Sequence, residues 1–102
     1  MRAKTLIEST TAAANALLII DNQNLNGSLS IVGLVTTESV AIQIPRVADP
    51  TLSNDAHWTN LIYDSITYVL DVNNNRRSIP FRGTYRIAKA ASIGNAFGIG
   101  FE

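Results

Sequence analysis

The stretch that decides the fold is Ala96-Phe97-Gly98-Ile99-Gly100-Phe101. Every second residue is large and apolar, and the residues between them are alanine or glycine. A period of two predicts a β-strand, because successive side chains point to opposite faces of a sheet. The small residues on the second face allow another backbone or sheet to approach closely.

The same alternation recurs earlier in the chain. Ser28-Leu29-Ser30-Ile31 follows Asn26-Gly27, a strong turn dipeptide, so we expect a strand to begin near Ser28. In residues 40–44 apolar β-branched residues alternate with alanine and glutamine. The next residue, Pro45, lacks an amide donor and tends to end a strand. These residues predict another strand.

Other segments carry weaker signals. Residues 10–20 are ambiguous between helix and strand because they begin with alanines, and we favour a strand from about Ala16. Residues 61–70 are rich in β-branched and aromatic residues, which is typical of sheet. We expect short strands in residues 78–81 and after Gly83. Loops are expected in residues 47–56 and 71–77.

These segments predict an all-β fold, either an antiparallel β-sandwich or a jelly-roll-like arrangement. About seven strands, roughly 8 to 15 residues apart, are expected. The 102 residues suit one domain, since a single core needs roughly 50 to 200 residues. We therefore expect a single domain over residues 1–102, with residues 1–9 as a candidate extended assembly arm. A domain of this size is marginally stable, so burial in an oligomer would help.

Composition removes several function classes. Eight basic residues balance eight acidic ones, so we expect no binding to nucleic acid or to a membrane surface. The absence of cysteine removes disulfides, thiolate nucleophiles and zinc knuckles. The first residues do not resemble a secretory signal, and the longest apolar run, residues 16–20, is far too short to cross a bilayer. We expect a soluble protein made in the cytoplasm.

Candidate catalytic chemistry is sparse. His57, with Asp49, Asp55 and Asp64 nearby in sequence, offers a conceivable metal site or a base–carboxylate pair, but the spacing matches no standard motif. One histidine supplies only one candidate base for a serine or threonine nucleophile. We expect no catalytic residues, no metal and no cofactor.

Two groups of residues are candidate contact surfaces. Arginines near aromatic residues can bind nucleic acid, yet arginine is also enriched at protein interfaces, which we favour because the net charge is zero. The candidate interface residues are Arg76, Arg77, Arg82, Phe97, Ile99 and Phe101. Arg86 lies in the same basic stretch. We expect Arg76 and Arg77 to contact acidic residues of a neighbouring subunit.

Trp58 is either a core anchor or part of an exposed platform for a sugar or peptide, and we favour the core. Trp58 and Tyr63 form the candidate ligand platform if the second interpretation holds.

The segment Gly83-Thr84-Tyr85-Arg86-Ile87-Ala88-Lys89, followed by small residues and Phe97-Gly98-Ile99, resembles small tailed-phage virion proteins. The first half fits the same outline. There an alanine-rich stretch leads into a strand and an Asn/Gly turn, and then come Leu29-Ser30-Ile31-Val32-Gly33-Leu34 and Thr37-Glu38-Ser39-Val40. Such proteins are β-sandwich subunits that decorate capsids, cement capsomers or form fibres and tail parts.

The resemblance implies a non-enzymatic bacteriophage virion structural protein, above all a capsid decoration or cement subunit that stabilises the particle. Its expected partners are further copies of itself, as a homo-oligomer, and the major capsid protein. Its expected location is the virion, after synthesis in the host cytoplasm. The alternatives are a tail or head-fibre component and a carbohydrate- or receptor-binding β-sandwich module, with an enzyme third.

Overall fold

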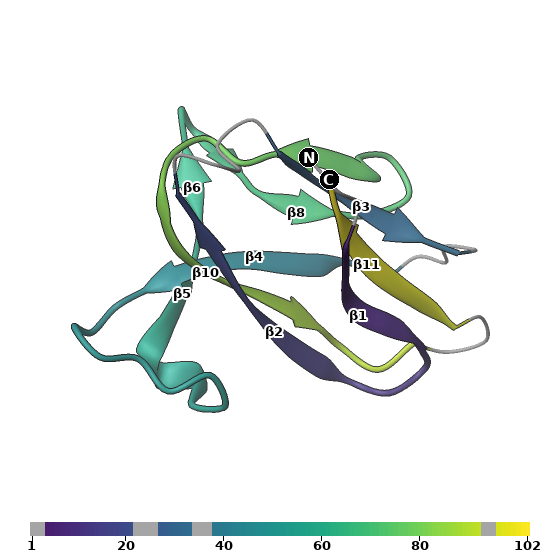
Figure 1. The fold of residues 1–102 in the computed structure, drawn as a ribbon, viewed down its shortest axis with the longest axis horizontal. Coiled ribbons are helices and arrows are strands. Elements are labelled where there is room, and N and C mark those ends of the chain that lie inside the picture. Colours follow the sequence, from purple (N-terminus) through teal and green to yellow (C-terminus); the bar gives the residue numbers. More distant parts are fainter. Residues whose placement is uncertain (1–3, 22–26, 34–37, 93–95) are drawn as a thin grey trace.

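The computed structural model describes residues 4–21, 27–33, 38–92 and 96–102. In these residues the chain forms β-strands and one short 3-10 helix, η1 (Asp55–His57). The strands build two antiparallel sheets around a shared core, with a small hairpin beside them (Figure 1). The expected all-β antiparallel sandwich is confirmed. No helix in this part of the chain has the length and apolar character needed to cross a membrane.

The first sheet has four strands, and its two central strands are β11 and β3. In spatial order the strands are β1 (Lys4–Thr10), β11 (Phe97–Phe101), β3 (Ser28–Val32) and β9 (Arg76–Ser78). All neighbours in this sheet are antiparallel. β11 therefore lies inside the sheet with a strand on either side.

The second sheet has five strands. Its spatial order is β2 (Ala14–Ile20), β10 (Gly83–Lys89), β4 (Val40–Pro45) and β5 (Trp58–Asn60), and β8 (Val69–Leu70) also pairs with β4. β10 is antiparallel to β2 and β4, and its register with β2 runs unbroken along the whole strand. β10 is thus the central strand on this side.

The core is filled by the alternating side chains of the two central strands. Tyr85 and Ile87 of β10 and Phe97 and Ile99 of β11 are all fully buried in one apolar cluster. Fully burying an apolar side chain of this size contributes roughly 1.5–3 kcal/mol. The Tyr85 hydroxyl donates a hydrogen bond of 2.5 Å to the carbonyl oxygen of Phe81, so its one polar group is satisfied inside the core.

Gly98 allows the backbone of strand β1 to lie close beside β11. A Cβ atom at this position would lie 2.8 Å from the amide nitrogen of Ser9, in contact with backbone that cannot rotate away. β1 also shifts its register against β11 between Thr5 and Ile7 and again between Ile7 and Thr10. The expectation that small residues on β11 admit another backbone is confirmed at Gly98.

Two expected strands differ from the structure. Residues 61–70 do not form one strand, because Asp64 and Ser65 have positive φ values of 54° and 64° and turn the chain. They close a hairpin of β6 (Ile62–Tyr63) and β7 (Ile66–Thr67), with the left-handed dihedrals of a type I′ turn. The strand expected in residues 78–81 lies earlier, in β9, because the chain leaves the sheet before Pro80.

The remaining expectations concern the first third of the chain. Residues 10–20 contain a strand that begins at Ala14, two residues before the expected start. Within residues 1–9, the part from Lys4 onward belongs to β1, which pairs with β11 at an edge of the first sheet. Residues 1–3, Asn26 of the expected turn, Leu34 and Thr37 lie outside the described residues.

We predict that Gly98→Val lowers the free energy of unfolding by about 1–3 kcal/mol, because the new side chain must displace the β1 backbone. Urea unfolding monitored by circular dichroism measures this change. Gly100→Ala is the matched control, since its Cβ would meet the end of the exposed Val32 side chain, 3.3 Å away, which can rotate. A Gly98→Val protein as stable as the wild type would contradict the packing described for β1.

We also predict that Tyr85 makes the fold sensitive to alkali. Burial raises the pKa of Tyr85 from 10.0 to about 12. Between these values the unfolded chain loses the tyrosine proton while the folded chain keeps it, so stability falls as pH rises. The pKa difference between the folded and the unfolded chain corresponds to about 2–3 kcal/mol of unfolding free energy. Tyr85→Phe should remove this part of the loss, measured by urea unfolding at about pH 9 and about pH 12. An equal fall in unfolding free energy in the wild type and in Tyr85→Phe would contradict this role of Tyr85.

Candidate functional site

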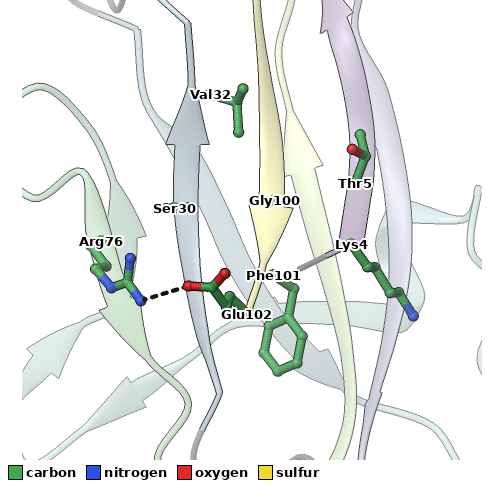
Figure 2. A pocket seen from close by; sticks show the side chains of 8 residues that line it. All are labelled: Lys4, Thr5, Ser30, Val32, Arg76, Gly100, Phe101 and Glu102. Carbon is green, nitrogen blue, oxygen red and sulfur yellow. Dashed lines mark ion pairs between the residues drawn. The ribbon is translucent and has the colours of Figure 1, made fainter. Parts of the chain in front are cut away.

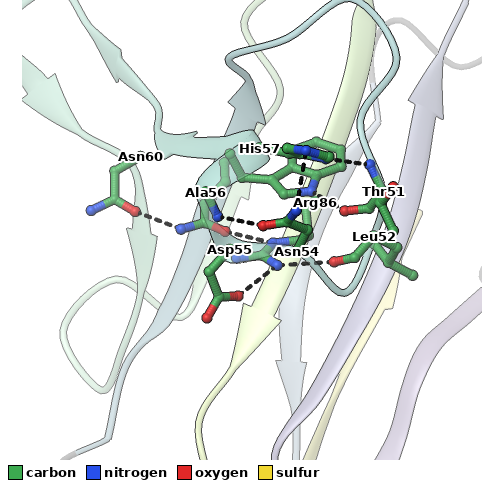
Figure 3. Close-up of polar contacts among 10 residues, drawn as sticks. Thr51, Leu52, Asn54, Asp55, Ala56, His57, Asn60 and Arg86 are labelled. Carbon is green, nitrogen blue, oxygen red and sulfur yellow. Dashed lines mark hydrogen bonds and ion pairs between the residues drawn. The ribbon is translucent and has the colours of Figure 1, made fainter.

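Arg86 is a buried charged residue with several hydrogen bonds, and it lies on the outer face of the second sheet. Its side chain is 3% exposed. Its Nε donates to Oε1 of Gln43 at 2.7 Å, and one Nη donates to the carbonyl oxygen of Leu52 and to Oδ1 of Asp55, both at 2.9 Å (Figure 3). The guanidinium carbon lies 5.6 Å from the centroid of a Trp58 ring. Arg86 therefore fastens the loop between β4 and β5 onto the sheet.

The same loop is closed by His57 and Trp58. The Nδ1 atom of His57 accepts a hydrogen bond from the backbone amide of Thr51 at 2.9 Å, and the indole Nε1 of Trp58 donates to the carbonyl oxygen of Thr51 at 3.0 Å (Figure 3). Trp58 is 3% exposed and presents no face to a ligand; it is buried beside Arg86 and is not part of the main core cluster. Among the described residues no group of three His, Cys, Asp or Glu side chains is placed to hold a metal ion.

Lys89 is the second buried cation. Its Nζ donates to the carbonyl oxygen of Ala12 at 2.9 Å and lies 4.5 Å from the ring centroid of Phe97. Burial lowers the pKa of Lys89, and the negative charge of Glu38 opposes that shift. The bond to Ala12 holds the turn between β1 and β2 against the end of β10.

Sequence reasoning missed the structural part played by both cations. Arg86 was grouped with the exposed arginines, and Lys89 was only the end of a predicted strand. The hydrogen-bond partners of Arg86 lie 31 to 43 positions earlier, and the carbonyl that Lys89 reaches lies 77 positions earlier. Local pattern carries no signal for contacts at such separations.

The three arginines expected at an interface have different surroundings. Arg76 lies 4.0 Å from Glu102, and both side chains are largely exposed, so this ion pair contributes little stability. Arg77 donates from Nε to the carbonyl oxygen of Val69 at 3.1 Å and stacks over the Tyr68 ring at 5.3 Å. Arg82 is exposed. Arg76 and Arg82 thus offer surface charge, whereas Arg77 mainly supports β8 and Tyr68.

Arg76 and Glu102 line a shallow pocket on the outer face of the first sheet. The pocket has a volume of about 210 Å³, and Ser30 and Gly100 form part of its lining. In Figure 2 the Arg76 and Glu102 side chains point toward each other from the two sides of β3. Lys4 lines the pocket as well, so its charged side chains are two basic and one acidic.

Phe97, Ile99 and Phe101 do not form the expected contact surface. They are 0%, 0% and 4% exposed, and their side chains fill the core of this chain. The strand that carries them lies between β1 and β3, so its hydrogen-bonding edges are already used. The alternating pattern showed a strand with an apolar face but not what covers that face.

An exposed apolar surface lies instead on the β6–β7 hairpin. Tyr63 and Ile66 are register partners and are each 47% exposed. The ring of Tyr63 lies 5.8 Å from that of Phe81, which is 39% exposed. We call Tyr63, Ile66 and Phe81 the hairpin patch. Of the two residues expected in a ligand platform, only Tyr63 belongs to an exposed surface.

A second exposed apolar group lies on β2. Leu17 and Ile19 point outward on the second sheet and are 46% and 58% exposed, while Ala16, Leu18 and Ile20 between and beside them are buried. A strand was expected near these residues, but the uninterrupted apolar run of residues 16–20 does not indicate which side chains face outward.

We predict that Arg86→Met detaches the loop between β4 and β5. The variant leaves the Leu52 carbonyl oxygen and Oε1 of Gln43 without their bonds to Arg86, at a cost of about 1–3 kcal/mol in unfolding free energy. Asp55→Asn is the control, because the Asp55 side chain is 89% exposed and its loss should cost less than about 1 kcal/mol. Urea unfolding and limited proteolysis within residues 46–57 measure both effects. Equal effects of the two substitutions would contradict a clamp centred on Arg86.

Comparison with family models, with curated proteins and with solved structures finds no match to this chain.

Proposed function

We propose that this chain is a non-enzymatic structural subunit of a bacteriophage virion, a capsid decoration or cement subunit that stabilises the particle through protein–protein contacts. The observation that carries the proposal is the hairpin patch, an exposed apolar surface on a domain whose other apolar side chains mostly form a closed core. Exposed apolar groups with a polar surround mark sites of contact with other proteins.

The composition of the hairpin patch suits a protein partner. Aromatic side chains are enriched at the energetically important positions of interfaces, where they fill pockets of the partner. Tyr63 and Phe81 supply such rings, and Arg77 stacks on the neighbouring Tyr68. The type I′ turn at Asp64 and Ser65 fixes the hairpin conformation before binding, which reduces the entropy lost on contact.

The groups with catalytic potential support a structural role. The Nδ1 atom of His57 is occupied by the amide of Thr51, and the donors of Arg86 and Lys89 bond to groups of the same chain. A nucleophile would need a base and an oxyanion site directed at one point. The polar groups instead hold loops and turns in place.

A carbohydrate- or receptor-binding module is the second candidate, and the exposed rings of Tyr63 and Phe81 favour it. Neighbouring aromatic rings offer apolar faces for a sugar or a peptide. Trp58 no longer belongs to this candidate, because its ring is buried. A tail or head-fibre component would use the same patch against a different virion protein.

We predict that the wild-type chain sediments with purified capsids of the phage that encodes it, and that the Tyr63→Ser, Ile66→Ser double variant binds them at least about tenfold more weakly. Loss of two central apolar contacts removes more than about 1.4 kcal/mol. Co-sedimentation at varied protein concentration measures the affinity.

Val32→Ser is the matched control, because Val32 is 51% exposed but lies on the first sheet. It should bind capsids like the wild type. A wild-type chain that does not sediment with capsids would overturn the proposal. Binding to a glycan array that is lost in the double variant would favour the second candidate instead.

A further inference from the structure

A groove lies on the outer face of the second sheet, beside the loop between β4 and β5. Its volume is about 570 Å³, and small-molecule sites typically measure about 300–1,000 Å³. Small side chains line much of it. Ala88 of β10 is the register partner of Ala41 on β4 and of Asn15 on β2, so these three residues form one row across the sheet. Asp55 and Arg86 also line the groove, which shares no residue with the hairpin patch.

Asp55 and Arg86 place a hydrogen-bond acceptor next to a donor at this groove. Oδ1 of Asp55 lies 2.9 Å from one Nη of Arg86, and Figure 3 shows the second carboxylate oxygen pointing away from the guanidinium group. That oxygen accepts no hydrogen bond from the described residues, and the other Nη of Arg86 donates none to them. The Nη is not fully enclosed, so a ligand can reach it. A firmly held cation thus keeps one donor unused beside an unused acceptor.

Two neutral polar side chains at the groove add further hydrogen-bonding groups. Asn15 and Ser39 are exposed, and neither side chain is hydrogen-bonded within the part of the chain that the structure describes. An amide and a hydroxyl can each donate and accept. The backbone of β10 is already paired with β2 and β4, so a ligand on this face meets side chains and not a strand edge.

The charged side chains at the groove compensate one another. Arg86 is paired with Asp55, and Lys89 is 2% exposed and lies near the negative charge of Glu38. An anionic ligand at the unused donor would be repelled by Asp55, and a cationic ligand at the unused acceptor would be repelled by Arg86. A neutral ligand rich in hydroxyl groups suits both residues, because a hydroxyl can donate to the carboxylate and accept from the guanidinium group.

We infer that this groove binds a neutral carbohydrate. Asp55 accepts a hydrogen bond from one ring hydroxyl, Arg86 donates to a neighbouring hydroxyl, and the apolar C–H face of the ring lies on the methyl groups of Ala41 and Ala88. The bonds of Arg86 to Gln43 and Leu52 hold the guanidinium group in place before the ligand arrives, so little entropy is lost in ordering it. The inference does not rest on the proposed virion function, since it follows from the groove alone.

Titration of the isotope-labelled wild-type chain with neutral disaccharides, followed by nuclear magnetic resonance, tests the site. The probes are maltose, cellobiose, lactose and N,N′-diacetylchitobiose. At least one of them should shift the backbone amide signals of Ala41 and Ala88 and the Nε–H signal of Arg86. Failure of all four probes to shift these signals would overturn the inference.

Two variants test the roles of the lining residues. Asp55→Asn should raise the sugar concentration at half-maximal shift at least about tenfold, because a charge-assisted hydrogen bond is lost. Ala88→Leu should abolish the shifts, since its larger side chain fills the row of small residues. Thr84→Leu is the matched control, because Thr84 lies on the same face of β10 but outside the groove, and it should bind like the wild type.

Asp55→Asn keeps the test independent of folding, since the Asp55 side chain is 89% exposed. Equal sugar affinity of this variant and the wild type would overturn the inference. The Tyr63→Ser, Ile66→Ser double variant should keep the wild-type sugar affinity even where it loses capsid binding. Loss of sugar binding in the double variant would place the sugar on the hairpin patch and would also overturn the inference.

Discussion

The packing of β10 against β11 across the sandwich is the interaction on which the other features depend. Tyr85 and Ile87 meet Phe97 and Ile99 in one cluster, and this fixes which face of each strand is inward. The outward positions are then fixed as well. Arg86 must point to the side where the loop between β4 and β5 covers it, and Gly98 must lie where β1 crosses.

Local alternation was sufficient to predict the fold class and several strands. β11 and β4 follow directly from period two, whereas the two faces of β2 do not, because residues 16–20 are all apolar. The hairpin in residues 61–70 was not predicted, because Asp64 and Ser65 adopt left-handed dihedrals that the sequence signals strongly only when glycine is present. Of its exposed patch only Tyr63 was named from the sequence; Ile66 and Phe81 were not.

The contacts of the buried charged residues could not be predicted from the sequence. An arginine between two core residues of a strand is expected to face solvent, and Arg86 does point away from the core. Its burial arises from a loop whose position depends on Trp58 and Thr51, and no short-range pattern encodes that contact. Conversely, Phe97 and Phe101 were considered for an interface because a pattern of apolar residues does not tell whether the covering surface belongs to the same chain.

The two exposed apolar surfaces lie at opposite ends of the second sheet. β2 forms one end, and the β6–β7 hairpin follows β5 at the other, where the amide of Leu61 and the carbonyl of Tyr68 bond to Ile42 of β4 (Figure 1). One surface can therefore be covered without blocking the other.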